Sequence, residues 1–326
     1  VLIDGFGAAA LAKHDRKRLR DGRVDLIEYN PVRYGALSAN LFRDHRKLLL
    51  VDGEIAFTGG TGIIDEYDYE GRADSYWHDL MLEVRGPCVG DWQALFVETA
   101  DRWRARPLHL PEPRGSSEPG AQTGRVVQSR SAVRAELARS QIRRVRYARR
   151  RVWLTTAYFV PSRKLRRALR RVARRGVDVR ILVPGPTMDH PWILHIARRY
   201  YGRLLRNGVR IFEYQPRFTH AKAMVCDDWV SIGSSNVDRW NLRWNLEANQ
   251  EVSDRDLARQ AEELFVEDMA LAREIDPERW RQRARLQRLR EWFWGYLVVV
   301  VLTWFSTRLF DPRRDRHPEE HQGPPR

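Results

Sequence analysis

The chain has 326 residues, enough for two domains or one large duplicated domain, and 43% of them are hydrophobic, which suits a folded globular core. The two cysteines, Cys88 and Cys226, exclude a disulfide framework and lack metal-ligand spacing, so a reducing compartment is expected. The net charge of +15 indicates anionic partners such as lipid headgroups, nucleic acid or phosphorylated substrates. However, 53 of the 58 basic residues are arginines, a skew that the base composition of a genome also produces.

The first half opens with an apolar stretch, Val1–Gly5, that predicts a strand. A helical stretch and a second strand, at 22–31, follow it. His45 and Lys47 come next, directly before the continuous apolar run Leu48–Val51. Runs of this kind are typical of central strands, so both Leu48–Val51 and its later counterpart Ala223–Cys226 are predicted to be buried on both faces.

The second half repeats this order. A strand at 179–185, a helix from about 192 to 206 and a strand at 208–216 precede His220-Ala-Lys222. The repeat predicts an α/β fold, a duplicated sandwich of two mixed β-sheet halves flanked by helices. The predicted divisions are 1–104 for the first half, 105–124 for a Pro- and Gly-rich linker, 125–255 for the second half, 256–291 for a basic helical region, 292–310 for a membrane anchor and 311–326 for a disordered tail.

One unit of the second half has no counterpart in the first. A strand at 151–159 and a helix at 161–176, with Ser162 at its start and Gly176 past its end, precede the repeated order. The first half is therefore expected to be incomplete at its start, either because the chain is a fragment or because a neighbouring protomer completes it. A sheet edge at Val1–Asp4 is then expected to be exposed.

The C-terminal region is predicted to be helical and to meet a membrane. Helices are predicted at 257–274 and 277–291, the second rich in arginine. Trp292–Thr307 holds sixteen uncharged residues, which as a helix reach about 24 Å, short of a hydrocarbon core of about 30 Å. Its aromatic ends suit an interface. A short span, an in-plane anchor and a buried core helix all fit this segment.

Two motifs carry the chemistry, and both read His-x-Lys-x4-Asp, at 45–52 and 220–227. If each motif begins a strand, its His and Lys point to the same face. Pairing of the two halves would then gather two imidazoles and two ammonium groups around one space. This set suits a phosphodiester, because lysines neutralise the phosphate oxygens, one histidine attacks phosphorus and the other protonates the leaving group. The lysines supply the charge, so neither a metal nor another cofactor is expected.

The sequence resembles the phospholipase D superfamily with its duplicated HKD motif, and within it the bacterial cardiolipin synthases. The matching stretches are 42–47, 56–60, 76–79, 158–161, 220–222, 233–236 and 245–247. The resemblance implies a covalent phosphohistidine on His45, with His220 as the general acid. It implies phosphate contacts from Lys47, Lys222, Gly60, Ser234 and Asn236, and histidine-orienting carboxylates at Asp79 and Glu247. Asp52 and Asp227 complete the motifs and are expected to hold the strand-to-turn geometry.

Two departures from the family pattern concern the turns. Gly62 stands where the family often has Asn, which removes a phosphate hydrogen bond from the first half. The second motif has one residue fewer between its Asp and the following glycine, which predicts a shorter hairpin turn.

The leading functional hypothesis is a phosphatidyl transferase that converts two phosphatidylglycerols into cardiolipin and glycerol. A phospholipase D hydrolase, which resolves the same intermediate with water, fits the residues equally well. A metal-independent nuclease fits the charge but gains nothing from Trp292–Thr307, so nucleic acid is disfavoured as a partner. An inactive fragment or scaffold is the non-catalytic alternative. The expected partners are anionic phospholipid and the membrane, and the expected location is the bacterial inner membrane with the catalytic part in the cytoplasm.

Overall fold

A computed structural model describes residues 1–33, 39–71, 75–113, 120–129, 135–237, 244–284, 289, 291, 293–297 and 300. The first-half elements are β1 (Leu2–Asp4), α1 (Lys13–Asp21), β2 (Ile27–Tyr29), η1 (Ala39–Leu41), β3 (Arg43–Asp44), β4 (Leu48–Val51), β5 (Ile55–Gly59), η2 (Asp65–Tyr67), β6 (Met81–Arg85) and α2 (Cys88–Asp101). The second-half elements are β7 (Thr123–Ser129), α3 (Glu136–Tyr147), β8 (Arg151–Thr155), α4 (Arg163–Ala173), β9 (Asp178–Pro184), α5 (Pro191–Leu205), β10 (Arg210–Tyr214), β11 (Ala223–Cys226), β12 (Trp229–Gly233), β13 (Asn245–Ser253), α7 (Arg255–Ala270), β14 (Ala272–Glu274) and α8 (Pro277–Gln282).

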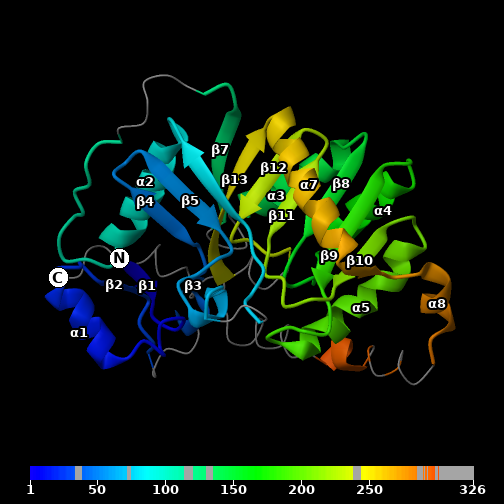
Figure 1. Cartoon of the computed structure of the whole chain (residues 1–326), viewed down its shortest axis with the longest axis horizontal. Helices are drawn as coiled ribbons and strands as arrows, with labels where there is room; N and C mark the ends of the chain where they lie inside the picture. Colours follow the sequence, from blue (N-terminus) through cyan, green and yellow to red (C-terminus); the bar gives the residue numbers. More distant parts are fainter. Residues whose placement is uncertain are drawn as a thin grey trace.

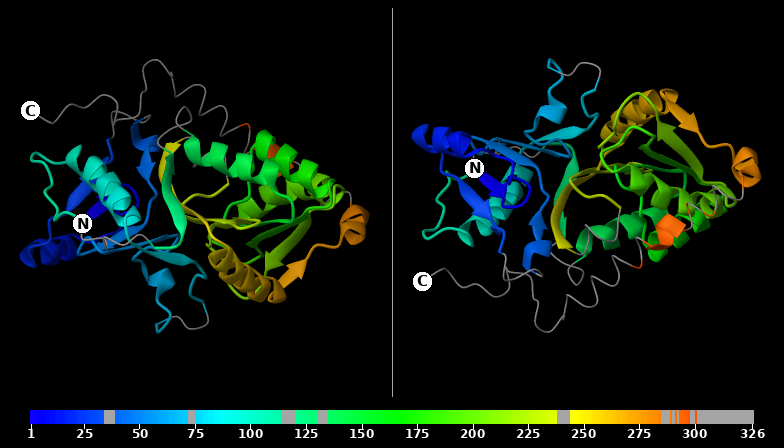
Figure 2. Two further views of the ribbon diagram at one scale, coloured as in Figure 1. Left: turned by 90° about the horizontal axis from the view of Figure 1, so that it is seen from above. Right: turned by 90° about the horizontal axis from the view of Figure 1, so that it is seen from below.

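The fold is mixed α/β, with one large sheet and two smaller ones (Figure 1). The large sheet has the order β14-β10-β9-β8-β11-β12-β13-β3, and β7 also pairs with β13. Helices α3, α4 and α5 pack on one face of this sheet and α7 on the other, as the view from below shows (Figure 2). The remaining strands form the sheets β4-β5-β6 and β1-β2 on the first-half side.

Helix α4 shows how the sequence sets these positions. Its buried residues, Leu165, Ala168, Leu169 and Val172, recur at helical spacing and pack into the core. The Ser162 hydroxyl caps the helix by accepting the N–H of Leu165 at 3.2 Å, as predicted for this start.

The same order of elements occurs in both halves. β1-α1-β2 and β9-α5-β10 each place two parallel strands beside a helix, and β4-β5-β6 and β11-β12-β13 are each antiparallel. In the second half β8 lies between β9 and β11 and joins the two units into one sheet. Among the described residues no strand joins β1 to β4, so the first-half units remain separate sheets.

This difference corrects the prediction for Leu48–Val51. β11 is buried along its whole length, as predicted, because β8 and β12 flank it. Within the described part of the chain β4 pairs with β5 alone, and Leu49 is 57% exposed. The apolar run is therefore an edge strand and not a central one.

The helices predicted after residue 254 are shorter than expected. α7 ends at Ala270, and Ala272–Glu274 forms β14, which pairs with the edge strand β10 and adds an Arg210–Glu274 ion pair at 2.7 Å. α8 ends at Gln282, because Arg283 takes an extended backbone conformation. No helix within the described ranges is both long and apolar enough to cross a membrane. The predicted anchor at 292–310 lies mostly outside those ranges, and the predicted tail at 311–326 lies wholly outside them.

Candidate active site

His45 follows β3 and is held by β13 of the other half. β3 runs parallel to β13, so the backbone N–H of His45 donates to the carbonyl of Leu246 at 3.1 Å. The next residue of β13, Glu247, is fully buried, and its carboxylate lies 3.1 Å from His45 Nδ1. The imidazole keeps 24% of its side chain exposed, so it is the part of this pair that a substrate can reach.

His220 precedes β11 and is held in the same way by the first half. Its backbone N–H donates to the carbonyl of His78 at 2.7 Å, and the next residue, Asp79, lies 2.9 Å from His220 Nδ1. Each histidine is therefore oriented by a carboxylate from the opposite half. The two imidazole centroids are 6.4 Å apart with their planes at 74°, so the rings border one space.

The two lysines lie beside these rings. Lys47 Nζ donates to the carbonyl of His45 at 2.7 Å, and Lys222 Nζ donates to the carbonyl of His220. Lys222 is almost fully buried, and its Nζ lies 2.9 Å from His220 Nδ1. The site thus gathers two lysine side chains around two imidazoles.

Burial sets the protonation states of this cluster. It lowers the pKa of Lys222 to about 7 and also lowers the pKa of Lys47. Burial, followed by the charge of Lys222, lowers the pKa of His220 to about 3. Burial opposes ionisation of Asp79, but Lys222 and the hydrogen bond from His220 outweigh it and hold the pKa of Asp79 below its usual value.

These protonation states decide which nitrogen can react. With its pKa near 3, His220 is neutral at pH 7 in the free protein. A neutral ring that donates Nδ1–H to a carboxylate leaves Nε2 unprotonated, and the geometry at His45 and Glu247 permits the same tautomer. Both rings can then present Nε2 as a nucleophile or a base.

Ser234 and Asn236 follow β12 and are both fully buried. The Ser234 hydroxyl donates to Glu247 Oε2 at 2.5 Å, so it fixes the carboxylate behind His45. Asn236 Oδ1 accepts the Tyr158 N–H at 3.3 Å, whereas Asn236 Nδ2 is buried without a partner among the described residues. A buried N–H without a partner destabilises the fold, so this amide suits a donor that binds an oxygen of a ligand.

Tyr67 is a residue of this cluster that the sequence did not reveal. Its hydroxyl lies 3.0 Å from Asp79 Oδ2, 2.6 Å from His220 Nδ1 and 3.1 Å from the Gly60 carbonyl. One sequence feature points toward it: Gly60 occupies the position of Ser234 in the repeat and brings no hydroxyl, so another residue must supply one. Tyr67 supplies that hydroxyl from η2.

Gly60 lies against Asp79. A Cβ at this position would stand 2.4 Å from both carboxylate oxygens of Asp79, so only glycine permits this approach. The Gly60 N–H donates to the Leu80 carbonyl at 3.2 Å. Gly62, at the position of Asn236, brings no side-chain amide to the first half.

Asp52 and Asp227 lie apart from the histidines, in the hairpin turns at the far ends of β4 and β11. Both have a left-handed backbone, with φ of 53° and 54°. Cys226 pairs directly with Trp229, and Val51 pairs with Ile55, so the second turn is one residue shorter. The Asp227 carboxylate accepts the backbone N–H groups of residues 149–151 at 2.8–3.0 Å.

Comparisons with known proteins point to one family. Residues 142–269 match the family model described as "Cardiolipin synthase, PLD-like domain". Cardiolipin synthase A of Pseudomonas putida is 35% identical over 89% of this chain and 60% of the relative. Probable cardiolipin synthase YwiE of Bacillus subtilis is 29% identical over 90% of this chain and 59% of the relative. The resemblance to the phospholipase D superfamily, and within it to bacterial cardiolipin synthases, is confirmed.

The fold also has a solved counterpart. Phosphatidylserine synthase of Haemophilus influenzae matches with a TM-score of 0.70, covering 94% of this chain and 81% of that one, at 14% identity. At that identity the match shows the shared fold. The chain spans 59–60% of the length of the two cardiolipin synthases compared.

Proposed function

We propose that the chain is a phosphatidyl transferase that converts two phosphatidylglycerols into cardiolipin and glycerol. The observation that carries the proposal is the pair of imidazoles on one space, each with Nδ1 against a carboxylate of the opposite half. The two adjacent lysines suit a phosphodiester anion. The cardiolipin synthases among its relatives support a lipid phosphodiester as the substrate.

In the first step His45 Nε2 attacks the phosphorus of one phosphatidylglycerol. The bond from phosphorus to the headgroup glycerol oxygen breaks, and His220 gives its proton to that oxygen, so that free glycerol leaves. The phosphatidyl group stays on His45 through a P–N bond. Lys47, Lys222 and the free amide N–H of Asn236 bind the non-bridging oxygens.

The proton on His220 arrives with the substrate. In the free protein burial and Lys222 keep the pKa of His220 near 3, so the ring is neutral at pH 7. A phosphate anion between the lysines offsets their charge and thereby raises the pKa of His220. Proton uptake by His220 is thus coupled to lipid binding.

In the second step the glycerol hydroxyl of another phosphatidylglycerol replaces water as the acceptor. His220, now neutral, takes the hydroxyl proton while the oxygen attacks phosphorus. The P–N bond breaks, His45 is regenerated and cardiolipin leaves. The reaction belongs at the bacterial inner membrane, where this lipid resides, and the free cysteines Cys88 and Cys226 suit a catalytic part in the reducing cytoplasm.

The test incubates the full chain with phosphatidylglycerol labelled in its acyl chains and separates the lipids by chromatography. Labelled cardiolipin with equimolar glycerol is expected. Phosphatidic acid as the sole product would contradict the transferase and identify a hydrolase. His45→Ala is expected to abolish turnover, and His14→Ala, which changes a histidine on α1 whose side chain is 74% exposed, serves as the matched control.

A further inference from the structure

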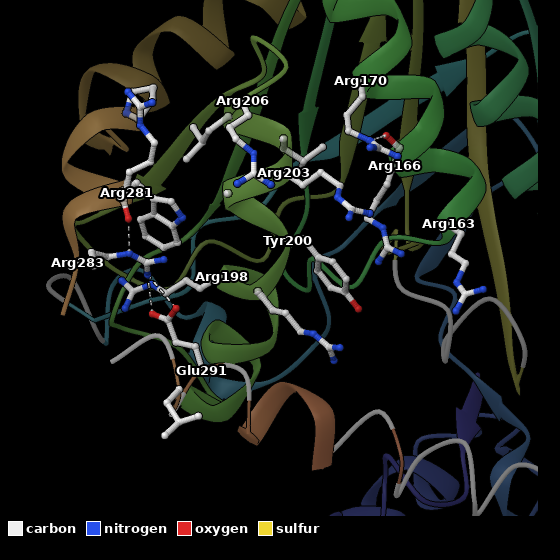
Figure 3. Close-up of a pocket in the computed structure, with 17 residues that line it drawn as sticks. Arg163, Arg166, Arg170, Arg198, Tyr200, Arg203, Arg206, Arg281, Arg283 and Glu291 are labelled. Carbon is white, nitrogen blue, oxygen red and sulfur yellow. Dashed lines mark hydrogen bonds and ion pairs between the residues drawn. The ribbon is translucent and has the colours of Figure 1, made fainter. Parts of the chain in front are cut away.

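A groove between α4, α5 and α8 lies apart from the histidines and is lined mainly by arginines (Figure 3). It encloses about 1300 Å³, and none of its lining residues belongs to the candidate active site. Nine of the seventeen lining residues are arginines, and Glu291 is the one acidic residue among the seventeen. These arginines define the arginine groove: Arg163, Arg166, Arg170, Arg198, Arg199, Arg203, Arg206, Arg281 and Arg283.

Much of this charge lacks a protein partner. Arg198 pairs with Glu213 and Arg283 with Glu291. By contrast Arg163, Arg203 and Arg206 form no ion pair with an acidic residue in the described part of the chain. Burial and the neighbouring guanidinium of Arg203 lower the pKa of Arg170.

Guanidinium groups gathered in this way favour a ligand that brings negative charge. Arg166, Arg170 and Arg203 extend toward one another from two neighbouring helices (Figure 3). A planar guanidinium binds phosphate through two parallel N–H bonds, so phosphate is the anion that such a groove suits best.

The border of the groove indicates where the phosphate comes from. Leu289 lines the groove, and residues 293–297 lie beside α5, because Arg199 Nη1 donates to the Gly295 carbonyl at 3.1 Å. Phe293, Trp294 and Tyr296 in this segment are 52%, 43% and 50% exposed. Exposed aromatic side chains beside basic ones are typical of surfaces that lie in a membrane interface.

We propose that the arginine groove docks the anionic headgroups of a phospholipid bilayer. Docking here is separate from the chemistry at His45 and His220, and it rests on the proposed function in that it holds the chain on the membrane that carries its substrate. A bilayer is the occupant because it offers phosphates to the arginines and an apolar layer to the aromatic residues. Nucleic acid or a soluble phosphate leaves the aromatic residues in water.

The test compares sedimentation of the full chain with vesicles of phosphatidylcholine and with vesicles that also contain phosphatidylglycerol. The triple variant Arg163→Gln, Arg203→Gln, Arg206→Gln is expected to bind phosphatidylglycerol vesicles about 100-fold more weakly, because each basic residue at an anionic surface contributes about 1 kcal/mol. Binding to phosphatidylcholine vesicles is expected to stay unchanged. All three residues are exposed, so the substitutions spare the core.

The matched control removes three charges from the opposite end of the molecule. Lys13→Gln, Arg18→Gln, Arg20→Gln changes exposed residues on α1, which lies far from α4 and α5 (Figure 1). This control is expected to keep at least nine-tenths of the preference for phosphatidylglycerol. Equal loss in both triple variants would overturn the proposal, because net charge would then explain the binding.

Two further arms identify the ligand. The first measures binding of inorganic phosphate and of duplex DNA to the full chain. If either binds the groove tightly while vesicles with phosphatidylglycerol bind no better than neutral vesicles, the ligand is a soluble anion or a nucleic acid, and the proposal is overturned. Activity on short-chain, monomeric phosphatidylglycerol separates docking from chemistry. The groove variant is expected to keep this activity, whereas His45→Ala is expected to lose it and still prefer anionic vesicles.

Discussion

At the scale of single residues, the two carboxylates behind the histidines receive their hydroxyl groups from different places. Ser234 donates to Glu247 from the segment directly after β12, whereas Tyr67 donates to Asp79 from η2. Gly60 cannot carry the missing hydroxyl, because even a Cβ there would meet the Asp79 oxygens at 2.4 Å. We infer that Tyr67 is a positioning residue that restores in the first half what Ser234 provides in the second.

Tyr67→Phe is expected to lower kcat about 5- to 10-fold and leave KM nearly unchanged, because one hydrogen bond that orients the Asp79–His220 pair contributes about 1 kcal/mol. The measurement is steady-state turnover of phosphatidylglycerol, with the melting temperature as a check on folding. Tyr69→Phe, at a tyrosine that is 63% exposed, is the control. Equal kcat in the two variants would rule out the positioning role.

Lys222 makes anion binding depend on pH. Burial lowers its pKa to about 7, so the ammonium is charged below that pH and neutral above it. Sulfate, whose own charge is constant in this range, is expected to inhibit turnover progressively less as pH rises from about 6 to 9. Lys222→Met is expected to flatten this dependence in direct sulfate binding measured by calorimetry. An affinity that is constant with pH in the unmodified chain would contradict the prediction.

The histidines and lysines of the site could be proposed from the sequence because each lies within a repeated motif, and Asp79 and Glu247 were expected from the family resemblance. Tyr67 was not found: its partner His220 lies 153 positions away, and the glycine at position 60 shows that a hydroxyl is missing but not which residue supplies it. The sequence also did not indicate which carboxylate serves which histidine. That pairing depends on β3 lying beside β13 and on His78 bridging to Thr219, which are contacts between halves.

At the scale of elements, the β11–β12 hairpin depends on Asp227. Its carboxylate accepts three backbone N–H groups at the start of β8, and its φ of 54° suits Asp or Asn better than most residues. Asp227→Ala is expected to lower the free energy of unfolding by about 1–2 kcal/mol, a range discounted for the partial exposure of the group. Asp228→Ala, which removes only a surface ion pair with Arg150, is the control for denaturant titrations.

The same hydrogen bonds give this contribution a pH dependence. They hold the pKa of Asp227 below its usual value, against the opposing effect of burial. A depressed carboxyl pKa stabilises the fold fully above the ordinary Asp pKa of about 4, and this stabilisation is lost as pH falls through the folded-state value. Asp227→Ala and the unmodified chain should therefore converge in stability in acid. A constant difference at every pH would show that the backbone conformation alone matters.

Local sequence patterns predicted whether a segment is a helix or a strand more reliably than they predicted which elements lie beside it. The helix over Arg163–Ala173 could be predicted because its spacing and its cap are local. β4 and β11 have equally apolar sequences, and only the strand β8 beside β11 makes one of them central. β14 was predicted as helix because a short, charged edge strand is defined by its pairing with β10 and not by its own residues.

At the scale of the whole molecule, the two halves share strands and core. β13 and β7 of the second half cover α2 of the first, and Ala248 from β13 packs in one cluster with Val89 and Trp92. The Trp92 indole N–H donates to Gln250 Oε1 at 2.8 Å within this buried contact. Each histidine is in turn bound to the opposite half, so neither half contains a complete site.

We therefore expect the halves to unfold as one cooperative unit, with far-UV circular dichroism, tryptophan fluorescence and turnover lost over one range of urea concentration. Trp92→Phe leaves Gln250 without its donor and opens a small cavity, so it is expected to shift the whole transition by about 2 kcal/mol without splitting it. Trp192→Phe, at a tryptophan that is 44% exposed, is the control. The contrary outcome is that Trp92→Phe unfolds the first half at a lower urea concentration while α7 and its sheet stay folded. Turnover would then be lost with the first transition alone, and the shared core would not couple the two halves.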